Sequence, residues 1–189
     1  MSQITVKNLT LAAMFLAIGI ILPFFTGQVP QIGMMLLPMH IPVLLCGLIC
    51  GWRYGAGVGF ILPVMRSFLF GMPPMFPMAA AMSFELAAYG LVIGFLYSRS
   101  RWQCVVALYR TLIFAMIAGR VVWGAAMMAL LGIDGGIFTF QMFAAGAFIN
   151  AVPGIILQLV LIPVIMVTLN RTGLVRFYRE KKDEVAVGK

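Results

Sequence analysis

Charged residues are scarce in this chain: they make up 10% of its 189 residues, and only five are Asp or Glu. Apolar residue types account for 63% of the chain, and the mean hydropathy is +1.08. A soluble domain of this size needs far more polar side chains to cover its surface. The shortage of charge therefore excludes an ordinary soluble protein and predicts a chain whose solvent is the lipid bilayer.

Histidine and cysteine are also scarce, with one His and three Cys. A single histidine cannot form a cluster of metal ligands, and no H-E-x-x-H motif is present. The odd number of cysteines argues against a disulfide scaffold, and we interpret Cys46 and Cys50 as packing residues of an apolar run. The sequence also lacks a G-x-x-x-x-G-K-[ST] phosphate loop and a G-x-S-x-G nucleophile motif. We therefore expect no cofactor, no metal, no catalytic residue and no ATP hydrolysis by this chain itself.

Positive charge is the one kind of charge in excess, because 13 Lys and Arg residues give a net charge of +8. They flank apolar runs and form no patch among base-stacking aromatic residues, so we expect no nucleic-acid partner. Nearly all of them gather at one set of segment ends, whereas the loops 26–39, 71–77 and 132–137 contain no Lys or Arg. The positive-inside rule then places both termini in the cytoplasm and these three loops outside.

Apolar periodicity and breaker residues divide the chain into helical segments. The predicted segments are residues 6–25, 40–52, 54–70, 78–97, 105–131 and 138–169. We interpret the first as a retained helix, because no signal-peptide cleavage site follows it. The predicted fold is therefore an all-α bundle of six transmembrane helices. It forms a single domain over residues 1–175, and residues 176–189 form a charged cytoplasmic tail.

Two of these segments have special features. The segment at 40–52 is too short for a full crossing, so we predict that it lies deep within the protein. The segment at 138–169 contains Pro153 and Pro163, and we expect it to be long and bent. The loop at 26–39 is apolar, so we expect it to fold onto the bundle.

Three charged side chains lie inside the apolar segments: Arg66, Glu85 and Arg120. A charge at membrane depth is costly and usually faces a cavity, a partner or a transport pathway. Arg66 lies about 6 Å and Glu85 about 10 Å from the same predicted membrane face, so they can form an ion pair. One carboxylate cannot neutralise two guanidiniums, and the other arginine then needs an anion, a backbone acceptor or water. A ligand carboxylate would fit the planar donor fork of arginine.

Other residues have two interpretations each. His40 opens the second segment, where it can bond a ligand or the carbonyls of the adjacent loop. Asn150 in the sixth segment can bind substrate or join helices by hydrogen bonds. Ala13 and Ala17 form a small-x-x-x-small pair, which can dock a partner or pack the bundle itself. The same two interpretations apply to the glycine series Gly47, Gly51, Gly55 and Gly59.

Several of these motifs together resemble a known family. They are Ala13-x-x-x-Ala17, Leu36-Leu-Pro-Met-His-Ile-Pro-Val-Leu-Leu-Cys-Gly47, Gly51-Trp-Arg-Tyr-Gly55 and Asn150-Ala-Val-Pro-Gly154. Over about residues 5–175 the chain resembles the substrate-binding S component of energy-coupling factor (ECF) vitamin transporters. The resemblance implies a multi-pass protein of the plasma membrane that binds one vitamin near the outer face. The pocket would lie between the last three helices and the first and third outer loops.

The resemblance also implies partners. The Ala13–Ala17 face would dock onto a transmembrane coupling subunit, which joins two cytoplasmic ATPase subunits. The missing phosphate loop agrees with this arrangement, because the partners would hydrolyse ATP.

The embedded charges narrow the ligand class. Two arginines against Glu85 favour a carboxylate vitamin such as pantothenate, niacin, folate or biotin over cationic thiamine. Pantothenate is our first choice, because its hydroxyl and amide groups can bond Asn150 and His40. Two other functions remain open. One is a membrane-embedded enzyme on a lipid-like substrate, with His40 and Asp134 as acid and base. The other is a ligand-free scaffold subunit in which both arginines are paired internally.

Overall fold

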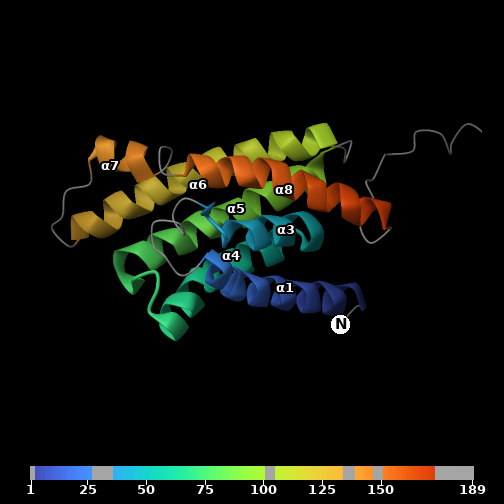
Figure 1. The fold of residues 1–189 in the computed structure, drawn as a ribbon, viewed down its shortest axis with the longest axis horizontal. Coiled ribbons are helices and arrows are strands. Elements are labelled where there is room, and N and C mark those ends of the chain that lie inside the picture. The colour runs from blue at the N-terminus through green and yellow to red at the C-terminus, as the bar shows by residue number, and fades with distance from the viewer. Residues whose placement is uncertain (1–2, 27–35, 101–104, 134–138, 147–150, 173–189) are drawn as a thin grey trace, which may run out of the picture.

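The computed structural model describes residues 3–26, 36–100, 105–133, 139–146 and 151–172, and within them every element is helical (Figure 1). This confirms the predicted all-α class. The elements are α1 (Gln3–Ile21), η1 (Leu22–Thr26), α3 (His40–Cys50), α4 (Trp52–Phe70), η2 (Met75–Ala79), α5 (Ala80–Arg99), α6 (Val105–Ile133), α7 (Phe140–Ala144) and α8 (Val152–Arg171).

Four stretches in the described residues are long and apolar enough to cross a membrane. They are Val6–Phe25, Met75–Arg99, Val105–Gly132 and Val152–Arg171. The α4 helix has a similar length but contains two arginines, Arg53 and Arg66. The number of six crossings and the cytoplasmic location of the termini therefore stay predictions.

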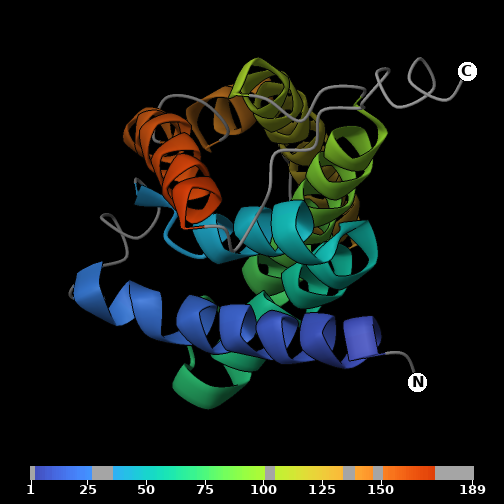
Figure 2. The same cartoon turned by 90° about the vertical axis from the view of Figure 1, so that its right-hand side faces the viewer.

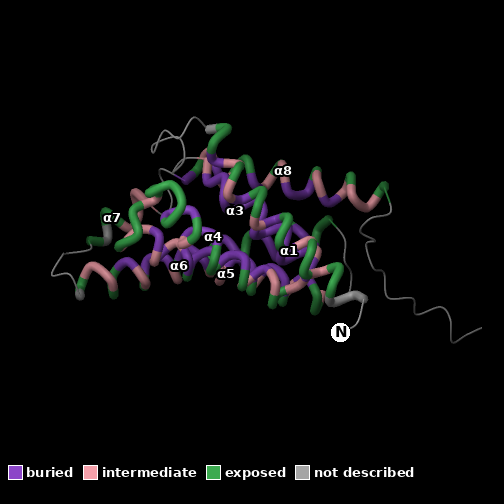
Figure 3. The backbone as a smooth tube through the Cα atoms, turned by 90° about the horizontal axis from the view of Figure 1, so that it is seen from below, coloured by how far each residue is buried: buried purple, intermediate pink, exposed green. Residues whose placement is uncertain are grey.

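The short helix α3 lies at the centre of the bundle. It packs against α1, α4, α5 and α8, and in Figure 2 it lies between α1 below and α8 above. Ten of its 11 residues are buried, which confirms that this short segment sits deep within the protein. Figure 3 shows that buried residues lie along the inner faces of the helices and exposed residues along their outer faces. Much of the exposed surface is apolar, as expected where lipid is the solvent.

Glycines bring α3, α4 and α5 into backbone contact. A Cβ atom on Gly55 would lie 2.6 Å from the Cα of Gly47, and one on Gly47 would lie 2.7 Å from the Gly90 carbonyl. A Cβ on Gly59 would collide with the backbone of Leu86. Small residues allow this close approach of membrane helices. The predicted glycine series therefore packs the bundle itself, and Gly51 forms the turn between α3 and α4 with a φ of 95°.

The last predicted segment differs from the structure. The sequence predicted one bent segment over 138–169, but the structure has two helices, α7 and α8. Pro153 explains where α8 begins: proline lacks an N–H, so it is tolerated in the first turn of a helix. Residues 147–150 lie outside the described part.

The helix ends divide by charge. Figure 1 shows that α1, α4 and α6 begin, and α5 and α8 end, at the same end of the molecule, on the right. These five helix ends carry the described basic residues other than Arg66 and Arg120, namely Lys7, Arg53, Arg99, Arg110 and Arg171. We call this the basic end. The basic residues that the sequence analysis used to predict topology thus lie together at one end of the folded protein.

Candidate functional site

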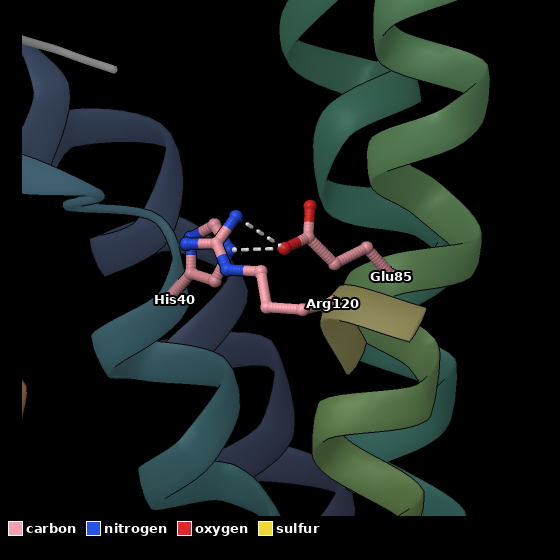
Figure 4. A network of polar contacts seen from close by, with 3 residues as sticks. All are labelled: His40, Glu85 and Arg120. Carbon is pink, nitrogen blue, oxygen red and sulfur yellow. Dashed lines mark ion pairs between the residues drawn. The ribbon is translucent and has the colours of Figure 1, made fainter. Parts of the chain in front are cut away.

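Glu85 on α5 lies at the centre of a buried polar cluster (Figure 4). Its Oε1 lies 2.9 Å from Nη1 of Arg120 on α6 and 3.4 Å from Nε2 of His40 on α3. The exposed fractions of His40, Glu85 and Arg120 are only 1%, 2% and 5%. Three helices therefore each contribute one polar side chain to a site that is closed to bulk water. We call these three residues the Glu85 cluster.

Helix packing explains why these side chains meet. Tyr89 lies one turn after Glu85, and its ring packs edge-on against the His40 ring, with centroids 5.0 Å apart at 81°. A Cβ on Gly119, the neighbour of Arg120, would lie 2.5 Å from the Tyr89 ring, so this glycine lets α6 approach α5. Tyr89 thus helps to position His40. The sequence reasoning missed Tyr89, although its spacing of four residues from Glu85 places both on one helix face.

The hydrogen bonding of the cluster is incomplete. Arg120 and His40 lie within ion-pair distance of Glu85 Oε1, but their N–H groups are not aligned for a hydrogen bond. Within the described residues, Glu85 Oε1 therefore accepts no hydrogen bond. Three further nitrogens of the cluster also have no hydrogen-bond partner among the described residues: Nε and Nη2 of Arg120 and Nδ1 of His40. The Nε2 atom of Gln158, a buried residue of α8, likewise has no hydrogen-bond partner there.

Such orphaned atoms are rare, because a buried polar group without a partner costs about 1–3 kcal/mol. The arginine and glutamine nitrogens are obligate donors, and a histidine nitrogen can donate or accept. The unpartnered atoms are therefore mostly donors, and they suit a molecule that brings acceptor oxygens.

Arg66 lies in a different place. Its Nη1 donates a 2.8 Å hydrogen bond to the carbonyl of Ile20, near the end of α1. Its Cζ lies 5.3 Å from the Phe24 ring and 5.7 Å from the Phe70 ring. The last four carbonyls of an α-helix lack an intrahelical donor, and Ile20 supplies one of them because α1 ends at Ile21. Arg66 therefore joins the end of α1 to the end of α4.

These contacts change the expected pairing. The sequence allowed an ion pair between Arg66 and Glu85, but Glu85 pairs with Arg120. Within the described ranges, Arg66 has no carboxylate within ion-pair distance. The depth estimate placed Arg66 and Glu85 at similar levels but gave no information on the direction in which each side chain points.

The remaining predicted residues fall into three groups. Ala13 and Ala17 are exposed on α1, whereas Ala12 and Phe15 on the same helix are buried. This small pair therefore faces away from the bundle. Asn150 and Asp134 lie outside the described residues. Cys46 and Cys50 are buried and free, which agrees with their interpretation as packing residues.

A protein-family model described as "ECF transporter, substrate-specific component" matches residues 7–167, which is most of the chain. The chain belongs to this family. The resemblance seen in the sequence is thus confirmed. No curated protein and no solved structure matches the chain.

Membership of this family assigns a function to the chain. The chain is the substrate-capture subunit of an ECF transporter, and it acts together with a small-molecule substrate, a coupling subunit and ATPases. Together with the apolar helices, the family indicates a multi-pass membrane protein. S components are transport subunits, which favours substrate binding over catalysis.

Proposed function

We propose that this S component captures a small vitamin that bears a carboxylate, and that the vitamin binds at the Glu85 cluster. The observation that carries this proposal is the set of buried nitrogens without partners: Nε and Nη2 of Arg120, with Nδ1 of His40 beside them. A carboxylate has two acceptor oxygens in one plane, which matches the planar donor fork of a guanidinium. The ligand would thus satisfy groups that the described residues leave unpaired.

The preference for an acid over a cation rests on the unpartnered donors and not, as the sequence had suggested, on net charge. Glu85 compensates Arg120, so with a neutral His40 the cluster has no net charge. The ligand is then held mainly by directed donors rather than by excess positive charge. A cation such as thiamine would be repelled by the Arg120 guanidinium, and its neutral acceptor atoms do not supply the two charged oxygens that a carboxylate brings to the orphaned donors. Among the acids, we propose pantothenate, whose hydroxyl and amide oxygens are further acceptors for His40 and Asn150.

Delivery of the substrate requires docking. We propose that Ala13 and Ala17 form the surface that meets the coupling subunit in the plasma membrane. Both residues are exposed, and small side chains permit close approach of another helix. Partner ATPases on the cytoplasmic side would supply the energy.

The docking proposal predicts a separation of binding from transport. Ala13→Trp or Ala17→Trp should lower vitamin uptake at least tenfold in vesicles that contain the partner subunits, while vitamin binding to the isolated chain stays unchanged. Val160→Trp is the control, because Val160 is an exposed apolar residue on another helix, α8. Equal loss of binding and uptake would assign the alanines to packing of the bundle.

Arg66 should behave differently from the Glu85 cluster. Arg66→Gln is expected to lower the melting temperature, because the Ile20 carbonyl loses its donor and two aromatic rings lose their cation. Affinity for the vitamin should change less than threefold. The checks are thermal unfolding in detergent and calorimetric titration of the same sample. A tenfold loss of affinity with an unchanged melting temperature would mean that Arg66 contacts the vitamin.

The direct experiment on the proposed function is to identify what the protein binds. The detergent-solubilised chain is purified without added ligand, and co-purifying small molecules are extracted and identified by mass spectrometry. We expect a carboxylate vitamin at near-stoichiometric amounts, and its loss in Arg120→Lys. Co-purification of a cationic vitamin alone would contradict the proposal.

A further inference from the structure

Two arginines at the basic end lie over aromatic rings. The Cζ atom of Arg53 is 5.2 Å from the Trp52 ring centre, and that of Arg99 is 5.1 Å from the Phe95 ring centre. Both rings are partly exposed, at 40% for Trp52 and 41% for Phe95. A cation–π contact holds a guanidinium flat against an apolar surface and leaves its N–H edge free to bind an anion.

The two arginines belong to one helix crossing. A Cβ on Gly94 of α5 would lie 2.6 Å from the Cα of Trp52, so the start of α4 touches α5 backbone to backbone. Arg53 directly follows Trp52, and Phe95 directly follows Gly94. Arg99 lies five residues beyond Gly94, or about 7.5 Å along the helix. Two positive groups therefore share the α4–α5 junction.

Neither charge is compensated in the part of the chain that the structure describes. Glu85 is the one acidic residue in that part, and it is buried with Arg120. Both Arg53 and Arg99 are exposed. Exposed arginines beside exposed aromatic rings are typical of the level at which lipid headgroups meet water.

An apolar track leads away from the arginines. Leu91 and Phe95 lie eight and four residues before Arg99 on the same face of α5, and Leu91 is 42% exposed. Phe84, which is 49% exposed, lies two turns before Leu91 and extends the same face of α5. An acyl chain can lie along these side chains while a phosphate reaches the guanidiniums above them. A soluble anion would not use the apolar part of this surface.

We propose that the α4–α5 junction binds the phosphate headgroup of an anionic phospholipid through Arg53 and Arg99. The phosphate oxygens accept hydrogen bonds from the free edges of both guanidiniums, and the acyl chains cover Phe95 and Leu91. This site is separate from the Glu85 cluster and does not depend on which vitamin binds there.

The test compares two double variants that remove the same charge from the same end. The purified, delipidated chain is titrated with phosphatidylglycerol or phosphatidylcholine, and bound lipid is counted by native mass spectrometry. We expect tighter binding of phosphatidylglycerol. The Arg53→Gln, Arg99→Gln protein should lose at least tenfold in affinity. The control, Arg110→Gln with Arg171→Gln, should lose less than twofold, because both residues are exposed and lie on other helices.

Three results would overturn the proposal. Equal losses of affinity for phosphatidylglycerol in the two double variants would mean that the whole basic end attracts the lipid without a specific site. Equal binding of the two lipids would exclude recognition of an anionic headgroup. Displacement of the lipid by an equal concentration of inorganic phosphate would make this a site for soluble anions. If the glutamine variant does not fold, Arg53→Lys with Arg99→Lys carries the test, since it keeps the charge and should still lose severalfold in affinity.

Discussion

Arg120→Lys is expected to lower the affinity for the carboxylate vitamin by about ten- to a hundredfold. Lysine keeps a positive charge opposite Glu85 but removes the planar fork that contains Nε and Nη2, the atoms without partners. A hydrogen bond to a charged group is worth about 1.5–3 kcal/mol, and each 1.4 kcal/mol corresponds to about a factor of ten in affinity. Calorimetric titration of the purified protein measures the change.

The choice of lysine keeps the fold intact. A neutral residue at position 120 would leave Glu85 buried without a counter-ion, which costs about 3–5 kcal/mol and confuses binding with stability. Arg110→Lys is the matched control, because Arg110 is exposed on the same helix, α6. The vitamin should bind this control as it binds the unchanged protein. Unchanged affinity in Arg120→Lys would remove Arg120 from the ligand site.

Gly55→Ala should destabilise the bundle strongly. The added Cβ would lie 2.6 Å from the Cα of Gly47 and 2.9 Å from the Gly90 carbonyl oxygen. Both neighbours are backbone atoms, so two helices must separate to make room. Overpacking of a core typically costs about 1–3 kcal/mol. At about 2–4 °C per kcal/mol for a chain of this size, the melting temperature should fall by roughly 2–12 °C.

A second glycine on the same helix provides the control. Nothing lies within 4 Å of a Cβ built on Gly57 of α4. Gly57→Ala should therefore leave the melting temperature unchanged or raise it slightly, because alanine favours the helix by up to about 1 kcal/mol. Thermal unfolding of both variants in the same detergent tests the difference. If Gly55→Ala were as stable as Gly57→Ala, the close contact of α3, α4 and α5 would be wrong.

Much of the fold was predictable because lipid demands long apolar helices, and breaker residues mark where they end. The second predicted segment, for example, begins at His40 as α3 does. The break between α7 and α8 was missed. Proline inside an apolar run can either bend a helix or lie in the first turn of a new one, and Pro153 lies in the first turn of α8.

The candidate site was predictable in its members and less so in its contacts. The rarity of charge in apolar segments selected Glu85 and Arg120 without any structure, but it also selected Arg66, which lies outside the Glu85 cluster. Sequence spacing gives the depth of a residue but not the neighbour that its helix face meets. The pairing of Glu85 with Arg120 and His40, and of Arg66 with the Ile20 carbonyl, therefore required the packing of five helices. Gln158 on α8 has an exposed fraction of only 1%, and its burial also depends on packing that sequence spacing does not give.

The central claim is that the buried donors of the Glu85 cluster hold the carboxylate of a vitamin. Its most direct test is calorimetric titration of the purified chain with pantothenate, and with the alcohol analogue in which a neutral CH₂OH group replaces the carboxylate. Thiamine serves as the cationic comparison. We expect pantothenate to bind at least tenfold more tightly than the alcohol and thiamine not to bind. Equal affinity for the acid and the alcohol, or tighter binding of thiamine, would contradict the claim.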